Sequence, residues 1–279
     1  MKTKLFIAFA LFALLLVGKL NAKFSGGSGT ETDPYQITSR EDLEALADSV
    51  DNINYWSQGK YFKVMNDITD SVRTVIAWKN MSNHAGFQGN FDGNYKSITL
   101  AIAEDPNRMH GGLFGVAVHD ASIKNVVVTG YVNASFIAGG IVGMAYNNTK
   151  IHNCLNSANI TSDYFTGGIV AIAEANEIMN CINIGTIKGQ YIVGGIIGTT
   201  NSITIDKCIN SGFVLGDTEV GGIAGFLGGY SIVKNCLNTG VVKGNTKVGC
   251  IVGGVPDFAF GSPTIENCYY DKQMCGGGE

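Results

Sequence analysis

The chain has 279 residues, of which 45% are hydrophobic and 15% are charged, and its formal net charge is −4. It contains 38 glycines and 4 prolines. This weakly acidic balance argues against a nucleic-acid partner, which requires a basic surface, and the composition is typical of an exported β-rich protein.

Residues 1–22 have the pattern of a secretory signal peptide. Two lysines precede an apolar run from Leu5 to Val17, and the segment ends on the small residue Ala22. Because the apolar run is too short to span a bilayer, we expect cleavage after Ala22 and an extracellular or cell-surface location. The predicted contact with a membrane is through this cleaved segment.

Residues 23–60 are predicted to form an N-terminal cap with one amphipathic helix. Ser39 and Asp42 resemble a capping box at the helix start. One face of the segment that follows is apolar, with Leu43, Leu46, Ala47 and Val50. Because the later repeats predict a stacked β structure whose open end exposes unpaired strand edges, we expect the helix to cover that end.

Residues 61–110 are predicted to form irregular first coils of the stacked structure. They include the turn sequence Asp92-Gly93-Asn94, which follows a phenylalanine. A catalytic or calcium-binding Asp92 is the alternative interpretation, but the spacing matches no calcium loop. We therefore interpret Asp92 as a turn residue.

Residues 111–279 carry two short phrases that recur with one period. The first phrase, Gly-Gly-Ile-Val-Gly or a close variant, starts at Gly111, Gly139, Gly167, Gly194, Gly221 and Gly249, steps of 27 or 28 residues. The second, Asn-Cys-x-Asn or a close variant, places cysteines at Cys154, Cys181, Cys208, Cys236 and Cys268. Self-similarity at such a period indicates a repeat array.

The period predicts an all-β fold, a right-handed parallel β-helix. Each period of 27–28 residues offers three short strand candidates separated by Gly and Asn, and these describe one coil of a solenoid whose coils stack about 4.8 Å apart. Right-handed coiling follows from the crossover rule for parallel strands. Vertical columns of Ile and Cys are expected to fill the interior.

Two columns of asparagine are expected to be structural. Asn153, Asn180 and Asn235 suit a corner, because Asn tolerates left-handed backbone angles. A second column can form a ladder of amide hydrogen bonds between coils, with Asn156, Asn183, Asn210 and Asn238. The alternative, a polar binding strip, remains open.

Seven cysteines in an exported chain allow either disulfides or buried free thiols. Cysteines stacked on adjacent coils have parallel Cβ vectors that fit the disulfide torsion poorly, so we expect free thiols that pack as small hydrophobic residues. Cys250 and Cys275 lie outside the column and are the candidates for a disulfide or a reactive thiol.

The two phrases resemble the GLUG-motif repeats of secreted and surface proteins, over roughly residues 111–267. The resemblance implies a β-helical, adhesin-like surface module without a known catalytic centre. The chain departs from the pattern at Ala171 and Cys250, which replace glycines, and at Val126, where later repeats have cysteine.

No catalytic, cofactor-binding or metal-ligating residues are predicted. Polysaccharide lyases and glycosidases need paired acids on neighbouring coils, and the acids here occupy scattered phases: Asp163, Glu174, Glu177, Asp206, Asp217 and Glu219. The four histidines are dispersed as well. A polysaccharide-active enzyme remains the alternative function.

The main hypothesis is an exported adhesion or structural module that binds a glycan or an extracellular protein through its long flank. Aromatic side chains stack on sugars, and the candidate ligand-binding residues are Tyr164, Tyr191, Phe258 and Phe260. Tyr164 and Tyr191 are 27 residues apart, so they are predicted neighbours. End-to-end self-association is a further predicted partnership.

Overall fold

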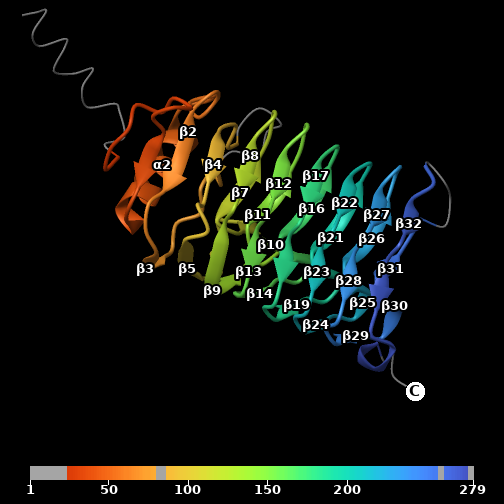
Figure 1. The fold of residues 1–279 in the computed structure, drawn as a ribbon. Helices are drawn as coiled ribbons and strands as arrows, with labels where there is room; N and C mark the ends of the chain where they lie inside the picture. Colours follow the sequence, from red (N-terminus) through yellow and green to blue (C-terminus); the bar gives the residue numbers. More distant parts are fainter. Residues whose placement is uncertain (1–23, 80–85, 257–260, 276–279) are drawn as a thin grey trace, which may run out of the picture.

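The computed structural model describes residues 24–79, 86–256 and 261–275. The predicted signal peptide, residues 1–22, and the candidate residues Phe258 and Phe260 lie outside these ranges. The described chain is a parallel β-solenoid with one α-helix near its N-terminal end (Figure 1). The predicted all-β solenoid is confirmed.

The strands form four parallel sheets that run along the solenoid. The nine-stranded sheet contains β1 (Tyr35–Ile37), β2 (Tyr61–Val64), β4 (Asn90–Asp92), β8 (Ser122–Lys124), β12 (Lys150–His152), β17 (Glu177–Met179), β22 (Thr204–Asp206), β27 (Ile232–Lys234) and β32 (Thr264–Glu266). The β15 sheet contains β6 (His110–Gly111), β10 (Ile137–Gly139), β15 (Phe165–Gly167), β20 (Ile192–Gly194), β25 (Thr218–Gly221) and β30 (Thr246–Gly249).

The other two sheets complete each coil. The β16 sheet contains β7 (Phe114–Ala117), β11 (Val142–Ala145), β16 (Val170–Glu174), β21 (Ile197–Asn201), β26 (Ala224–Gly228) and β31 (Val252–Gly254). The twelve-stranded sheet contains β3 (Ile68–Val72), β5 (Ser97–Ile102), β9 (Val127–Asn133), β13 (Leu155–Asn156), β14 (Asn159–Thr161), β18 (Ile182–Asn183), β19 (Ile187–Lys188), β23 (Ile209–Asn210), β24 (Val214–Leu215), β28 (Leu237–Asn238), β29 (Val242–Lys243) and β33 (Tyr269–Tyr270).

A full coil has five short strands, as in β12 to β16, so the prediction of three strands per coil was wrong. Each repeated phrase contains a corner and therefore contributes to two strands. Asn153, with a left-handed φ of 55°, ends β12 and starts the turn into β13. Gly168 and Ile169 likewise separate β15 from β16. The corner positions Asn153, Asn180 and Asn235 all have φ between 52° and 55°, as predicted.

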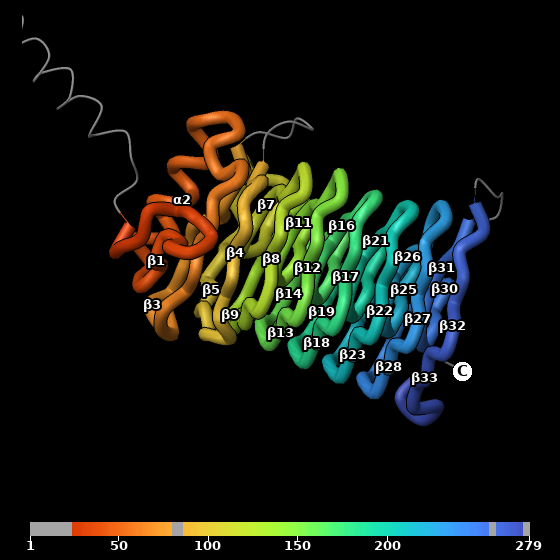
Figure 2. The backbone as a smooth tube through the Cα atoms, turned by 45° about the horizontal axis from the view of Figure 1, so that its top comes forward, coloured from red at the N-terminus to blue at the C-terminus, as the bar shows by residue number. Residues whose placement is uncertain are grey.

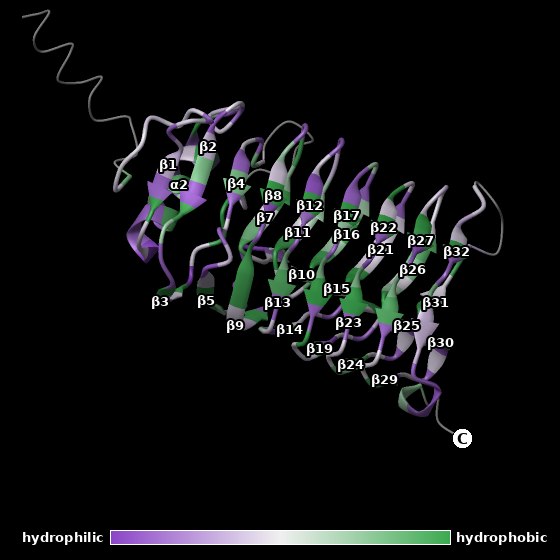
Figure 3. Ribbon diagram, in the orientation of Figure 1, coloured by the Kyte–Doolittle hydropathy of each residue, from purple (hydrophilic) through white to green (hydrophobic). Residues whose placement is uncertain are grey.

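Residues one period apart lie side by side, because successive coils stack in register (Figure 2). Ile151 pairs with Ile178, for example, and Ile178 with Ile205. The predicted interior column of isoleucines is buried: Ile141, Ile169, Ile196, Ile223 and Ile251. Figure 3 shows hydrophobic colour on many of the strands and hydrophilic colour on the helix and several turns.

The cysteine column is also interior and free. Cys154, Cys181, Cys208 and Cys236 are buried and unpaired, and Cys268 is partly exposed and unpaired. Burial raises the pKa of the Cys181 and Cys208 thiols. A hydrogen bond with Cys208, followed by burial, raises the pKa of Cys236. The predicted free thiols are confirmed.

The buried asparagine ladder joins four coils. The Nδ2 atom of Asn156 donates to Oδ1 of Asn183 over 2.7 Å, and the next two steps, to Asn210 and Asn238, measure 2.8 Å each. All four side chains are fully buried. A Cβ atom at Gly195 would overlap the Asn210 side chain, so the second glycine of the repeated phrase makes room for this ladder.

Helix α2 (Arg40–Asn52) covers the N-terminal end, as predicted, and contacts β1 and β3 (Figure 1). Its predicted apolar face is buried in the main core: Leu43, Leu46, Ala47 and Val50. Ser39 Oγ accepts a hydrogen bond from the Asp42 N–H over 3.4 Å. The Asp42 carboxylate instead accepts from Thr38 N–H over 2.7 Å, so half of the expected capping box forms.

The first coils of the solenoid are irregular. The pairing of β3 with β5 contains a register shift between Ile68 and Val72. Aromatic rings fill this part of the core, where Phe87 lies 5.7 Å from Phe62 and 4.8 Å from Phe114 between ring centroids.

A disulfide joins Cys250, which directly follows β30, to Cys275, which follows the 3-10 helix η1 (Lys272–Met274). The two Cα atoms are 5.5 Å apart. The Cys275 Sγ atom lies 3.9 Å from Nδ2 of Asn238, the last residue of the buried ladder. Of the two roles predicted for these cysteines, the disulfide is the one observed. Within the described ranges, no helix has the length and hydropathy needed to cross a bilayer.

Candidate functional site

Three aromatic side chains stack on the outer flank of the solenoid and form what we call the aromatic ladder: Phe136, Tyr164 and Tyr191. They immediately precede β10, β15 and β20, which are neighbours in the β15 sheet. The ring centroids of Phe136 and Tyr164 are 4.3 Å apart, and those of Tyr164 and Tyr191 are 4.7 Å apart. The predicted proximity of Tyr164 and Tyr191 is confirmed.

The two tyrosines of the ladder are exposed although the rings touch, whereas Phe136 is partly buried. Tyr164 is 41% exposed and Tyr191 is 46% exposed. Sequence reasoning missed Phe136, although it lies 28 residues, one period, before Tyr164. A search for aromatic residues at the repeat period, and not only for tyrosines, would have found it.

The ladder limits which ring faces a ligand can reach. Interplanar angles of 30° and 20° place one face of Tyr164 against Phe136 and the other against Tyr191. Tyr164 can therefore offer a ligand only its edge and hydroxyl group. Among the residues that the structure describes, no further ring stacks on Tyr191, so one of its faces has no ring contact there.

The backbone shows which residue follows Tyr191 on the next coil. The carbonyl of Asp163 accepts hydrogen bonds from the N–H groups of Gln190 and Tyr191, over 3.0 and 3.2 Å. One coil later, the carbonyl of Gln190 accepts from Asp217 and Thr218 over 2.8 and 3.0 Å. The repeated pattern places Thr218 directly beyond Tyr191.

A polar column runs beside the ladder and corrects one sequence prediction. Asp163 and Asp217 were expected at scattered phases, but they occupy the same corner position on two coils, with Gln190 on the coil between them. Because adjacent coils are about 4.8 Å apart, the backbones of the two aspartates are separated by roughly 10 Å. Their separation of two periods is not apparent when only adjacent coils are compared. Gln190 Nε2 donates to Asp163 Oδ1 over 3.3 Å, and Asn245 Nδ2 donates to Asp217 Oδ1 over 3.0 Å.

A second apolar cluster, separate from the main core, supports the ladder. Its buried members are Val116, Val118, Ile137, Met144 and Ala171, and its partly buried members are Phe136, Tyr146, Phe165 and Ile172. Side chains alternate along a strand, and Ala138 belongs to the main core while its neighbour Ile137 belongs to the second cluster. The cluster therefore lies on the outer side of the β15 and β16 sheets.

Two further exposed tyrosines belong to other parts of the solenoid. Tyr131 belongs to β9 of the twelve-stranded sheet and is 40% exposed, whereas Tyr230 is in the turn before β27 and is 72% exposed. Neither has a ring contact of the kind that joins the ladder residues within the described chain.

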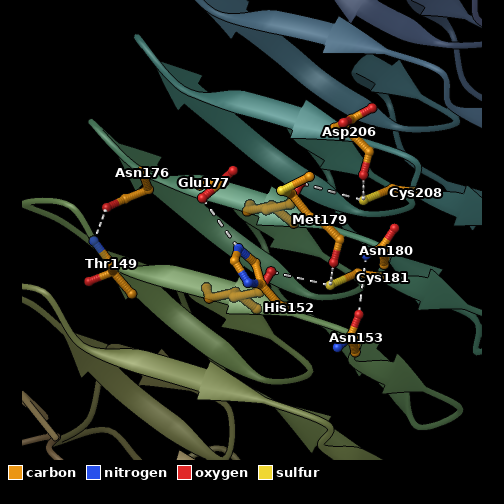
Figure 4. A network of polar contacts seen from close by, with 12 residues as sticks. Thr149, His152, Asn153, Asn176, Glu177, Met179, Asn180, Cys181, Asp206 and Cys208 are labelled. Atoms are coloured by element: carbon orange, nitrogen blue, oxygen red, sulfur yellow. Dashed lines mark hydrogen bonds and ion pairs between the residues drawn. The ribbon is translucent and has the colours of Figure 1, made fainter. Parts of the chain in front are cut away.

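The outer face of the nine-stranded sheet is a separate polar surface (Figure 4). His152 Nε2 lies 3.4 Å from Glu177 Oε2, and the corner residues Asn153 and Asn180 are hydrogen-bonded over 3.2 Å. No group of three or more His, Cys, Asp or Glu side chains in the described ranges is placed to hold a metal ion.

A depression of about 490 Å³ lies at the N-terminal end of this polar surface. Its lining includes Lys63, Asp92 and Lys124, which are register neighbours on β2, β4 and β8. Asp92 Oδ1 accepts hydrogen bonds from Asn94 N–H over 2.8 Å and from Asn125 Nδ2 over 2.9 Å. These bonds agree with the interpretation of Asp92 as a turn residue.

Comparisons with known proteins support the fold more than the function. No protein-family model matches the chain. A candidate Gly-rich membrane protein of Evansella cellulosilytica is 28% identical over 130 residues, which are 44% of this chain and 14% of that protein. The chain thus corresponds to a small part of that relative.

A solved structure shares the architecture. The crystal structure of a candidate immunoglobulin A1 protease from Bacteroides ovatus superposes with a TM-score of 0.69 at 22% identity. The likeness covers 90% of this chain and 79% of that one. At this identity it establishes a common fold and leaves the activity of this chain open.

Proposed function

We propose that the protein is an exported cell-surface adhesion or structural module that binds glycan or extracellular protein ligands through one flank of the solenoid. The observation that carries the proposal is the exposed aromatic ladder, which is continuous with the second apolar cluster. Contiguous exposed apolar surface marks interaction sites in soluble proteins. Tyrosine suits such sites because its ring is apolar and its hydroxyl group is polar.

Three observations support the proposed location at a cell surface. The signal-like segment at residues 1–22 favours export, and the membrane-protein name of the Evansella relative is consistent with a surface location. The resemblance to GLUG-motif repeats supports the same proposal. End-to-end self-association is a compatible proposal, because β32 is the last strand of its sheet within the described residues and Ile265 on it is 49% exposed.

The alternative is a polysaccharide lyase or glycoside hydrolase on the same scaffold. A retaining glycosidase needs two carboxyl groups about 5 Å apart, and an inverting one needs them about 6.5–9.5 Å apart. Asp163 and Asp217 are the acids that share a corner column, and the Gln190 amide between them bonds to Asp163. This arrangement supports binding more than hydrolysis.

The test is an array of glycans and extracellular matrix proteins, read beside a reducing-sugar release assay on the same polysaccharides. We expect binding without sugar release by the wild-type protein, and loss of binding in the double variant Tyr164→Ala, Tyr191→Ala. Tyr131→Ala and Tyr230→Ala are matched controls, because they remove exposed tyrosines from other surfaces. Sugar release, or binding that only the control variants weaken, would contradict the proposal.

A further inference from the structure

We propose that the free face of Tyr191, above Thr218, is the binding position for one pyranose ring of a neutral glycan. The sugar would occupy the place of the ring that is missing from the next coil. This inference rests on the proposed function and specifies its ligand class and its contact residues.

The first step is the spacing of the ladder. Its ring centroids are 4.3 and 4.7 Å apart, close to the coil spacing of about 4.8 Å. The next coil continues the backbone but not the aromatic series, because it presents Thr218. A threonine side chain is much smaller than a phenol ring, so room for a flat ligand group lies against Tyr191.

The second step is the chemistry around that position. Thr246, one coil further, donates its hydroxyl hydrogen bond to Thr218 Oγ1 over 3.1 Å. Asp217 is exposed beside Thr218, with Asn245 bonded to its Oδ1 atom. Hydroxyl, amide and carboxylate groups beside an aromatic face match a sugar, whose ring has an apolar C–H face and a rim of hydroxyl groups.

The third step is charge. Glu219 and Lys247 form an ion pair of 2.9 Å, so their charges offset each other. Asp217 is then left as a negative charge at this position, and Asp163 adds another in the same corner column. Like charges disfavour binding, so the position favours a neutral glycan over one built from uronic acids or sulfated sugars.

The test uses the full chain and four probes: cellohexaose, a β-1,4-galactan oligomer, an α-mannan oligomer and oligogalacturonate. Isothermal titration of wild-type protein is expected to show binding to at least one neutral probe and none to oligogalacturonate. Tyr191→Ala should weaken that binding by about tenfold, the equivalent of one aromatic stacking contact, whereas Tyr191→Phe should retain it.

Thr218→Tyr provides the opposite test. A fourth ring should stack on Tyr191, raise the melting temperature and abolish binding of the same neutral probe, because it fills the position. Loss of binding with a raised melting temperature cannot come from misfolding, so the two readouts together separate occupation of the site from damage to the fold.

The outcomes distinguish the two proposals. Unchanged binding of the neutral probe by Thr218→Tyr or Tyr191→Ala would overturn this inference and leave the adhesion proposal in place. Preference for oligogalacturonate, or no binding to any neutral probe by a protein that binds elsewhere on the array, would also overturn it. Absence of all array binding would overturn the proposed function itself.

Discussion

Single residues hold the coils together through the buried asparagine ladder. Asn183 donates to Asn210 on the next coil and accepts from Asn156 on the previous one. It also closes its own turn, because its Oδ1 atom accepts from the Gly185 N–H over 3.1 Å and its Nδ2 atom donates to the Gly185 carbonyl over 3.2 Å. All these groups are out of contact with water, so each lost bond leaves a buried polar group unpaired.

Asn183→Ala is therefore expected to lower the free energy of unfolding by about 3 kcal/mol or more. The matched control is Asn180→Gly, at the exposed corner, where φ is 52° and glycine adopts the backbone readily. Its cost should stay within about 1 kcal/mol. Urea unfolding monitored by circular dichroism measures both. Equal losses in the two variants would contradict a ladder that stabilises the stack.

His110 is a second residue whose burial has a measurable consequence. It is 2% exposed, and neither ring nitrogen has a hydrogen-bond partner within the part of the chain that the structure describes. Burial lowers the pKa of His110, and the positive charge of Arg108 lowers it further. The folded protein therefore keeps this imidazole neutral at pH values where the unfolded chain binds a proton.

The sign of the pH effect follows from this difference. Below about pH 6.5 the unfolded chain binds a proton at His110 that the folded protein does not bind. As the pH is lowered, the free energy of unfolding therefore decreases until the pH reaches the folded-state pKa of His110. Above about pH 6.5 the contribution of neutral His110 is fully present. His110→Leu should reduce the loss of stability between about pH 7.5 and about pH 5, measured by urea unfolding. The same loss in wild type and variant would contradict this account.

At the scale of elements, helix α2 is the part that local sequence signals predicted best. Ser39, the start of the helix and its apolar face are all found where the pattern placed them. The strand count was predicted poorly, because a phrase such as Asn153-Cys154-Leu155-Asn156 combines a corner with a strand end. Periodicity identifies which residues are equivalent, but it does not show where the backbone bends within one period.

Removing core volume from α2 should destabilise the N-terminal end. Leu46→Ala, at 0% exposure, is expected to cost about 3 kcal/mol through the cavity that it leaves, and Ser39→Ala about 1 kcal/mol through the lost cap. The control Asp48→Ala changes an exposed position on the same helix and should have almost no effect. Guanidinium unfolding gives the three values. A cost for Leu46→Ala no larger than that of Asp48→Ala would show that the helix does not close the core.

At the scale of the whole molecule, the interior could be predicted from the sequence and the outer flank only in part. Interior residues such as Ile196 and Cys208 must match the residues above and below them, so the repeat period reveals them. Outer positions carry no such constraint. Phe136 could have been found from its spacing of one period before Tyr164, whereas the second apolar cluster became visible only when the coils were stacked. The sequence also identified Cys250 and Cys275 as the cysteines outside the column. It did not show whether they form a disulfide with each other or remain as reactive thiols.

The most direct test of the account is a crystal structure of the protein with the neutral oligosaccharide that binds it most tightly. The account predicts one pyranose ring parallel to the Tyr191 phenol ring, about 4–5 Å from it, with hydroxyl groups bonded to Asp217 or Thr218. A sugar bound in the depression on the nine-stranded sheet, or on any surface that leaves Tyr191 free, would contradict it.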